Sequence, residues 1–442
     1  MKVKGIKFGI LGMGRSGLSV AAKIKELGGI PFLSDNNSED KIPDADKIKM
    51  TFRTEFGGHT QKLLENDILI LSPGIPGKIR ILQDAKKMNC RMISEIEFSF
   101  LIKQNKSKII AVTGSNGKST TVSLIHHILK EAGFNAVLAG NIGIPLSSYP
   151  LEKAGIDIIV LELSSFQLEL IDKFKADVAA LINITPDHLN RYNSFADYAA
   201  MKFNIFNNQT ENDLAILNYD DMNTKKYNEI ANRKIKYFSL NSETDIYYKN
   251  NFIIINGRKY SLQNTSLKGP HNIANVMCSI LAISPFKVDA RIIQNSIDTF
   301  TPLPHRLEFV SEISGVKFYN DSKATNTDSV KYALSSFDKP LRIILGGAGK
   351  NEDYSVLIPY LINNAKKVYL TGDTIDEMAA AFIGKIKFDV IEDFESVIKK
   401  AFSDSEQGDI ILLSPACTSY DRFDNFEERG NTFKQIVMGL KR

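Results

Sequence analysis

Short hydrophobic runs alternate with amphipathic stretches along most of the chain. The first runs cover residues 7–11, 30–34 and 67–71, and each one ends at a glycine, aspartate or Ser-Pro turn. Apolar runs of this length, bounded by turn signals and separated by helical patterns, predict parallel strands joined by helices. The same signature recurs at residues 136–138, 156–163, 179–184, 341–345, 367–370 and 409–413. The pattern therefore predicts an α/β protein.

The runs fall into three blocks. A stretch around residues 95–108, which we expect to be a polar helix, ends the first block. Pro302 and Pro304 stiffen the joint between the second and the third. The sequence therefore predicts domains at residues 1–102, 103–303 and 304–442, each with a mostly parallel sheet flanked by helices.

Composition narrows the classes of function. The 442 residues are 43% hydrophobic and 24% charged, as in an ordinary globular protein, and the net charge of +4 gives no argument for nucleic acid or membrane. The three cysteines lie far apart, without metal or disulfide spacing. Glycines break the N-terminal apolar run, and no cleavage pattern follows it. We expect a cytoplasmic protein without membrane insertion.

The most informative segment joins a predicted strand at residues 108–113 to a glycine turn and a helix. Backbone N–H groups of such a loop bind phosphate oxygens, the lysine supplies charge, and a hydroxyl can bind Mg²⁺. The predicted ATP-binding residues are Gly114, Ser115, Asn116, Gly117, Lys118, Ser119 and Thr120. Val112 occupies the position of the first glycine in the usual motif, so an ordinary strand-to-helix turn is the alternative interpretation.

A second glycine turn, GMGRSG at residues 12–17, follows the first strand. Asp35 lies about twenty residues beyond its start, as in a dinucleotide fingerprint. The turn fits a nicotinamide cofactor, the diphosphate of another nucleotide, or a tight turn that only packs helix on strand. A second phosphate loop one domain later argues against simple hydride transfer.

Polar residues follow the neighbouring strands of the second block. Glu162 ends one run and is placed like the acidic Mg²⁺ ligand of an ATPase, although a helix-start glutamate is an alternative. His188 and Asn141 follow two further runs, where a structural histidine and a turn asparagine are the alternatives. Lys202, taken by itself, is predicted to be a solvated helix lysine.

Together these residues resemble the Mur ligases, the ATP-dependent amino-acid ligases of peptidoglycan assembly, and especially their D-glutamate-adding branch. The resemblance covers nearly the whole chain, through the motifs TGSNGKSTT, GNIG, ELSSFQLE, NITPDHLNRY, HRLE, NDSKATN and SPACTSYDRFDNFEERG. It implies a Rossmann-like N-terminal domain for a UDP-linked substrate, a P-loop ATPase domain, and a Rossmann-like C-terminal domain for the incoming amino acid. The implied reaction adds D-glutamate to UDP-N-acetylmuramoyl-L-alanine through an acyl phosphate.

The resemblance also implies roles for individual residues. The UDP-substrate residues would be Arg15, Ser16, Asp35, Ser72 and Asn141. Further ATP residues would be Asn272, Arg306, Asp321 and Lys323, although Arg306 also fits a salt bridge at the domain joint. The D-glutamate residues would be Thr325, Lys350, Ser419 and Phe426, the last through its backbone.

The family's catalytic and metal residues fall on positions already noted. Lys202 would be carbamylated, which turns an ammonium into an anionic oxygen ligand. Two Mg²⁺ ions would be bound by Ser119, Glu162, His188 and carbamylated Lys202. Catalysis would rest on Lys118, Glu162, His188 and Lys202.

Other functions stay open at this stage. A sibling ligase that adds another amino acid and a folylpolyglutamate synthase would share the ATPase core, although the latter would not need the first block. A nicotinamide dehydrogenase with an accessory ATPase domain and a non-catalytic nucleotide-binding regulator belong to different classes. We expect a monomer that acts on small-molecule substrates, without a nucleic-acid partner.

Overall fold

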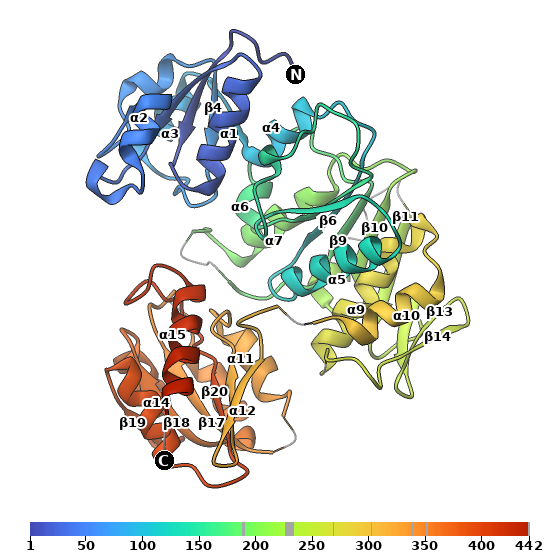
Figure 1. The fold of residues 1–442 in the computed structure, drawn as a ribbon, viewed down its shortest axis with the longest axis vertical. Helices are drawn as coiled ribbons and strands as arrows, with labels where there is room; N and C mark the ends of the chain where they lie inside the picture. Colours follow the sequence, from blue (N-terminus) through green and yellow to red (C-terminus); the bar gives the residue numbers. More distant parts are fainter. Residues whose placement is uncertain are drawn as a thin grey trace. The chain divides into compact units, whose positions relative to one another are not determined.

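The computed structural model describes residues 1–187, 191–225, 234–267, 269–301, 303–337, 339–350 and 352–440. These residues form three β-sheets flanked by helices (Figure 1), which confirms the expected α/β fold with three domains. One compact unit consists of Met1–Ile184, Arg191–Leu262 and Ala274–Ile297. The second consists of Thr185–Asn190, Gln263–Ile273 and Asp298–Arg442. The domain boundaries given above stay predictions.

The N-terminal sheet has the strand order β3-β2-β1-β4-β5, and neighbouring strands run parallel. Its strands are β1 (Lys7–Leu11), β2 (Ile30–Ser34), β3 (Arg53–Glu55), β4 (Ile68–Leu71) and β5 (Arg91–Ser94). Its helices are α1 (Arg15–Glu26), α2 (Ala45–Thr51), α3 (Arg80–Lys87) and α4 (Glu95–Ile102). The order reverses between β1 and β4, and ligands of such sheets bind at the carboxyl ends of the strands at this point.

The central sheet has the order β14-β13-β12-β11-β10-β9-β6-β8-β7, parallel from β7 to β12 and antiparallel at β13 and β14. Its first strands are β6 (Lys108–Thr113), β7 (Ala136–Gly140), β8 (Ile158–Glu162), β9 (Val178–Leu181) and β10 (Leu214–Asn218). The others are β11 (Lys234–Ser239), β12 (Ile246–Lys249), β13 (Phe252–Ile255) and β14 (Arg258–Ser261). The associated helices are α5 (Lys118–Glu131), α6 (Ser165–Leu168), α7 (Phe195–Phe203), α8 (Met222–Lys225), α9 (Pro270–Ile283) and α10 (Ala290–Thr299). Because β6 lies between β8 and β9, residues that follow all three strands share one edge of the sheet.

The C-terminal sheet has the order β15-β16-β20-β17-β18-β19, with only β15 antiparallel to its neighbour. Its strands are β15 (Glu308–Ile313), β16 (Val316–Asn320), β17 (Leu341–Gly346), β18 (Ala365–Thr371), β19 (Phe388–Val390) and β20 (Ile410–Leu413). Its helices are α11 (Thr327–Leu334), α12 (Ile358–Asn364), α13 (Ile375–Phe382), α14 (Phe394–Ser403) and α15 (Phe426–Gly439). The loops after β16, β17 and β20 therefore meet at one edge of this sheet.

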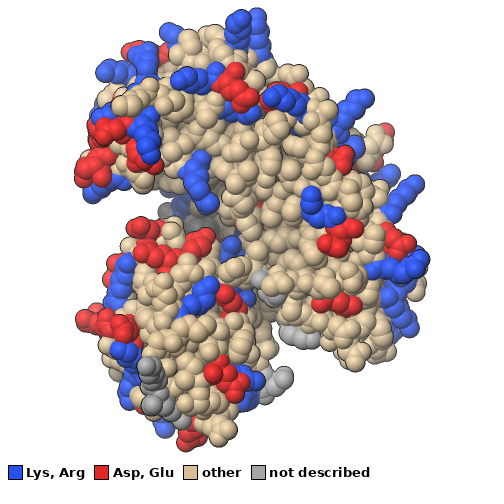
Figure 2. Space-filling model, viewed as in Figure 1, with Lys and Arg blue, Asp and Glu red and all other residues tan. Residues whose placement is uncertain are grey.

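The surface agrees with the weak net charge. On the face drawn in Figure 2, lysine and arginine side chains lie interspersed with aspartate and glutamate. Among the described residues, no helix combines the length and the hydropathy needed to cross a bilayer.

The helix after β5 differs from the polar helix expected around residues 95–108. α4 ends at Ile102, and its residues Ile96 and Phe98 are fully buried in a core cluster that extends from the N-terminal into the central sheet. The ring of Phe98 meets that of Phe8 edge-on, with centroids 5.8 Å apart. The helix is confirmed, but its expected polar character was wrong, because Glu95 and Glu97 make this apolar helix look solvated although both are buried.

Glu97 fixes the loop after α6 to α4. Its carboxylate is fully buried and accepts the backbone N–H groups of Asp172, Lys173 and Phe174, at distances of 3.0, 2.9 and 2.9 Å. Three donors compensate the cost of removing a carboxylate from water. The N-terminal domain thereby holds a loop of the central domain through one side chain.

We expect the Glu97→Gln variant to lose about 2–4 kcal/mol of unfolding free energy. The substitution removes the charge and turns an amide NH₂ group toward a backbone N–H. Thermal unfolding measures the loss as a lower melting temperature. Asp172→Asn is the matched control, because the Asp172 side chain is 57% exposed and should tolerate the same chemical change. Equal melting temperatures for the two variants would contradict the structural role of Glu97.

Candidate functional site

The loop between β6 and α5 has the backbone that a phosphate cradle requires. Gly117 has φ +86°, and a Cβ at this position would lie 2.3 Å from the side-chain oxygen of Asn275 on α9. Only glycine fits both the left-handed conformation and the close approach. The loop leads into the N-terminus of α5, where the N–H groups of the first turn and the positive end of the helix dipole favour an anion.

Lys118 lies over this loop. Its ammonium donates to the carbonyls of Gly114 and Ser115, both at 2.8 Å, so the charge is held beside the loop. Ser119 and Thr120, which follow on α5, are buried with exposed fractions of 1% and 6%. The predicted phosphate-binding residues therefore lie together at one end of β6.

Asn183, just beyond β9, shapes the loop from the other side. Its side chain accepts from the backbone N–H of Asn116 at 2.9 Å and donates to the Asn116 carbonyl at 3.0 Å. Its own carbonyl accepts the N–H of Ser115 at 3.0 Å. Sequence reasoning gave Asn183 no role, although its position directly after a strand next to β6 was a usable signal.

Glu162 and Asn141 are brought together at the same edge. The Asn141 amide donates to the Glu162 carboxylate at 2.7 Å, and the Asn141 N–H donates to the Glu162 carbonyl at 2.9 Å. Glu162 is 1% exposed and stands opposite Val112 in the β6–β8 register, two residues before Gly114. A buried carboxylate therefore lies at the strand end beside the phosphate loop.

Lys202 is not the solvated lysine that its local sequence indicates. Its side chain is buried on α7, and the ammonium donates to the Gly114 carbonyl at 2.8 Å. It also lies 4.6 Å from the ring centroid of Tyr198, whose hydroxyl is 3.0 Å from that of Ser115. Tyr198 and Lys202 are four residues apart, a spacing that places both on one helix face. The isolated-residue interpretation failed because it ignored what this face packs against.

The residues at this edge suit a hard cation. Ser119 and Glu162 offer oxygen ligands of the type that Mg²⁺ takes beside nucleotide phosphates, and both are buried. His188 lies outside the described residues, and within the described ones no three His, Cys, Asp or Glu side chains cluster as a protein-only metal site would.

Three of the predicted UDP-substrate residues line one pocket. Arg15 and Ser16 from the start of α1 face Asn141 across an opening of about 120 Å³, which Gln167 of α6 also lines. An arginine with hydroxyl and amide groups suits a phosphorylated, polyhydroxylated ligand. The pocket is therefore lined both by residues at the carboxyl edge of the N-terminal sheet and by residues at the edge of the central sheet.

Asp35 and Ser72 act on the glycine turn itself. The Asp35 carboxylate accepts the N–H of Met13 at 2.7 Å and that of Asn37 at 2.9 Å. The Ser72 hydroxyl lies 3.4 Å from the Gly12 carbonyl. Neither residue lines the pocket beside Arg15. Their structural role is to hold the turn, and direct substrate contact stays a prediction.

Within the second unit, Asp321 lies at the end of β16 among buried groups. Its carboxylate accepts from the Ser414 hydroxyl at 2.8 Å and from the Leu307 N–H at 3.2 Å. Burial raises the pKa of Asp321 to about 7, and the nearby Arg306 guanidinium opposes this shift. The carboxyl can therefore donate or accept a hydrogen bond near neutral pH.

The predicted D-glutamate residues come from loops at the same edge of this sheet. Ser419 is buried after β20, and Phe426 begins α15 with its ring 4.9 Å from the Lys323 ammonium. Thr325 is half-buried in the loop after β16. The Lys350 ammonium pairs at 3.3 Å with Asp187, which belongs to the same unit.

Arg429 of α15 ties two of these loops together, and sequence reasoning missed it. The buried guanidinium donates to the Ser322 hydroxyl and carbonyl at 3.0 and 2.8 Å, and to the Thr418 and Cys417 carbonyls, both at 3.0 Å. The planar donor array of arginine fits several acceptors at once, which a lysine cannot.

Asn272, at the start of α9, and Arg306 are half-buried; their roles toward ATP stay predictions.

Three family models match the chain in order. The Mur ligase MurD-like N-terminal domain matches residues 7–94, the Mur ligase middle domain residues 112–283, and the Mur ligase glutamate ligase domain residues 305–417. These ranges contain the two glycine turns, the edge residues Glu162 and Lys202, and Ser322 of the C-terminal site.

Curated relatives match over the full length. The UDP-N-acetylmuramoylalanine--D-glutamate ligase of Caldicellulosiruptor saccharolyticus is 36% identical, with 100% of both chains covered. The enzymes of the same name from Natranaerobius thermophilus and Clostridioides difficile are 37% and 36% identical, with 98% and 100% of both chains covered.

Solved structures share the fold at lower identity. UDP-N-acetylmuramate-alanine ligase from Thermotoga maritima aligns with a TM-score of 0.65 at 18% identity, over 99% of this chain and 100% of that one. A pseudomurein peptide ligase type C from Methanothermus fervidus aligns with a TM-score of 0.64 at 18% identity, over 99% and 100%. With three family models and full-length relatives in agreement, the chain belongs to the Mur ligase family.

Proposed function

We propose that this protein joins D-glutamate to the L-alanyl carboxylate of UDP-N-acetylmuramoyl-L-alanine, with conversion of ATP to ADP and phosphate, in peptidoglycan precursor synthesis. The observation that carries the proposal is the phosphate loop under Lys118, flanked by buried Glu162 and Lys202. The shared name of the full-length relatives supports the choice of substrates. It also argues against a dehydrogenase, a folylpolyglutamate synthase and a regulator.

A carboxylate is a poor electrophile, so the reaction needs activation. The γ-phosphoryl group of ATP moves to the L-alanyl carboxylate oxygen, which gives an acyl phosphate and ADP. The amine of D-glutamate attacks the acyl carbon, loses a proton, and expels phosphate as the C–O bond breaks. Lys118 and the N–H groups at the start of α5 stabilise the negative charge on the transferring group.

The proposal gives the remaining predicted site residues the following roles. Arg15, Ser16 and Asn141 line the pocket for the UDP substrate. Lys350, Thr325 and Ser419 bind the two carboxylates of D-glutamate through charge-assisted and neutral hydrogen bonds. Asn272, Arg306, Asp321 and Lys323 bind the remainder of ATP.

Mg²⁺ would be held by Ser119, Glu162, His188 and a carbamylated Lys202, in two sites. When bound, the metal neutralises phosphate charge and orients the phosphates. The monomeric state and the cytoplasmic location stay predictions.

The substrate assignment is tested by phosphate release with UDP-N-acetylmuramoyl-L-alanine and a panel of amino acids. We expect release with D-glutamate to exceed that with L-glutamate, L-lysine or diaminopimelate by at least about a hundredfold. A site that pairs both carboxylates of D-glutamate leaves its polar groups unpaired when a carboxylate is missing or differently placed. Comparable release with another amino acid would assign the chain to a sibling activity.

For the Lys202→Ala variant, we expect a drop in kcat of about a hundredfold, because an anionic group beside the phosphate loop is removed. Formate or acetate at millimolar concentration should restore part of the rate by replacing the carbamate. Lys118→Ala is the matched control, since a carboxylate cannot replace a missing cation. Rescue of Lys202→Ala by methylammonium instead would show that the ammonium is the working form and would refute carbamylation.

A further inference from the structure

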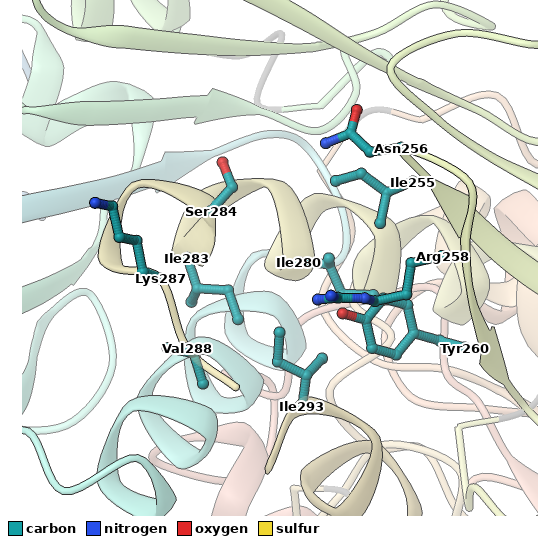
Figure 3. Close-up of a pocket in the computed structure, with 10 residues that line it drawn as sticks. All are labelled: Ile255, Asn256, Arg258, Tyr260, Ile280, Ile283, Ser284, Lys287, Val288 and Ile293. Carbon is teal, nitrogen blue, oxygen red and sulfur yellow. The ribbon is translucent and has the colours of Figure 1, made fainter. Parts of the chain in front are cut away.

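The central domain contains a second hollow, which shares no residue with the proposed ligation site. It has a volume of about 280 Å³ and lies between the β13–β14 hairpin and the end of α9 (Figure 3). This size is at the lower end of the range for small-molecule sites. The residues that line the hollow determine which kind of ligand it can bind.

The floor of the hollow is aliphatic. Ile280 and Ile283 from α9, Ile293 from α10 and Ile255 from β13 line it, with exposed fractions of 2, 1, 5 and 9%. Tyr260 of β14 adds its ring beside them and is 3% exposed. An apolar group bound here would be removed from water on several sides, which favours an aliphatic ligand.

The rim of the hollow is polar and cationic. Arg258 on the hairpin and Lys287 in the loop after α9 are both exposed, and in Figure 3 the Lys287 ammonium points away from the isoleucines. Neither side chain makes a hydrogen bond or ion pair with any residue in the part of the chain that the structure describes. Two exposed cations beside an apolar floor are groups to which an anion with an apolar part can bind.

The hairpin turn determines the strand face on which Arg258 lies. Asn256 and Gly257, with φ of +48° and +75°, form a two-residue turn of the type that hairpins favour. Arg258 follows this turn, and Tyr260 lies on the same strand face two residues later. Figure 3 shows the side chains of Arg258 and Tyr260 extending from the hairpin toward Ile280 of α9. Lys259, on the opposite face, lies over the Phe252 ring at 5.8 Å instead.

We propose that this hollow binds a small amphipathic anion. The aliphatic part of the ligand packs on the isoleucine floor, and its carboxylate or phosphate head bonds to Arg258, with Lys287 adding charge. Guanidinium groups bind both kinds of head through two parallel hydrogen bonds. Ser284 and Asn256, at the same rim, offer further hydrogen bonds.

The test uses the full-length protein with ¹³C-labelled isoleucine δ1 methyl groups. Octanoate, octyl phosphate and octylammonium, each below its critical micelle concentration, are titrated while methyl resonances are recorded by NMR. We expect saturable chemical-shift changes of the Ile280, Ile283 and Ile293 methyls with octanoate or octyl phosphate. The dissociation constant for octylammonium should be at least about tenfold higher. The stronger of the two anions identifies the preferred head group.

Variants assign the binding to this hollow. Arg258→Gln should weaken anion binding about tenfold or more, whereas Lys259→Gln, one residue along and on the other strand face, should leave it unchanged. Ser284→Trp should block the mouth and remove the shifts. Unchanged ligation activity and melting temperature in all three variants establish that the fold is intact. Equal binding of octylammonium, shifts confined to other isoleucines, or normal octanoate binding by Arg258→Gln would each overturn the proposal.

Discussion

A Lys118→Ala variant is expected to release ADP about 10²–10³-fold more slowly in the presence of both substrates, because a preorganised cation at the transferring phosphoryl group is lost. The structure supplies the reason for the size of this effect. The ammonium is held at 2.8 Å from two loop carbonyls, so its charge already lies at the phosphate loop before ATP binds. The melting temperature should change little, since Lys118 is only half-buried.

Lys130→Ala is the matched control for this experiment. Lys130 lies in the last turn of the same helix, α5, and is exposed to solvent. A coupled assay for ADP, run with and without D-glutamate, measures both variants. Normal substrate-dependent turnover by Lys118→Ala would refute the phosphate-loop assignment, whatever the behaviour of Lys130→Ala.

The second large effect is expected for Arg429, a residue that is not predicted to contact a substrate. In Arg429→Lys, one ammonium has to replace a guanidinium that serves Ser322, Cys417 and Thr418. Burial already lowers the pKa of Arg429 to about 10, so the group is charged but poorly solvated. We expect kcat/KM for D-glutamate to fall by about a hundredfold, since small displacements of binding groups cost this much.

The measurement must separate positioning from simple unfolding. Initial rates at varied D-glutamate, recorded at a temperature where the variant is still folded, should show the loss mainly in KM for D-glutamate. Arg422→Lys is the control, because Arg422 lies in the same loop region but is exposed. If Arg429→Lys lowered only the melting temperature and left KM for D-glutamate unchanged, Arg429 would have a structural role alone.

Several features could be predicted because they depend on local backbone chemistry. The strands at Lys7–Leu11 and Ile30–Ser34 have the bounds that their apolar runs predict. The glycine loop at residues 114–117 is visible in the sequence because a left-handed residue next to another chain segment needs glycine. The sequence also shows which residues directly follow strands, and for this reason Glu162 and Asn141 were expected at the carboxyl edge of the sheet.

Other features depend on which helix face meets which strand. Lys202 looked solvated until α7 was seen to pack its Tyr198–Lys202 face on the phosphate loop. The buried face of α4 was hidden by Glu95 and Glu97, whose carboxylates accept hydrogen bonds from distant backbone N–H groups. Asn275 and Arg429 carry no local signal, because the side chain of each bonds to residues far away in the sequence.

The sequence by itself therefore determined the α/β class, the two glycine turns and the chemistry of the residues that follow the strands, since these depend on local periodicity and backbone conformation. Only the tertiary structure decided which polar groups are buried, which ones face each other, and that a cationic hollow lies at Arg258. Those outcomes depend on contacts between residues remote in sequence, and hydrophobic periodicity carries no information about which partner a polar side chain will meet.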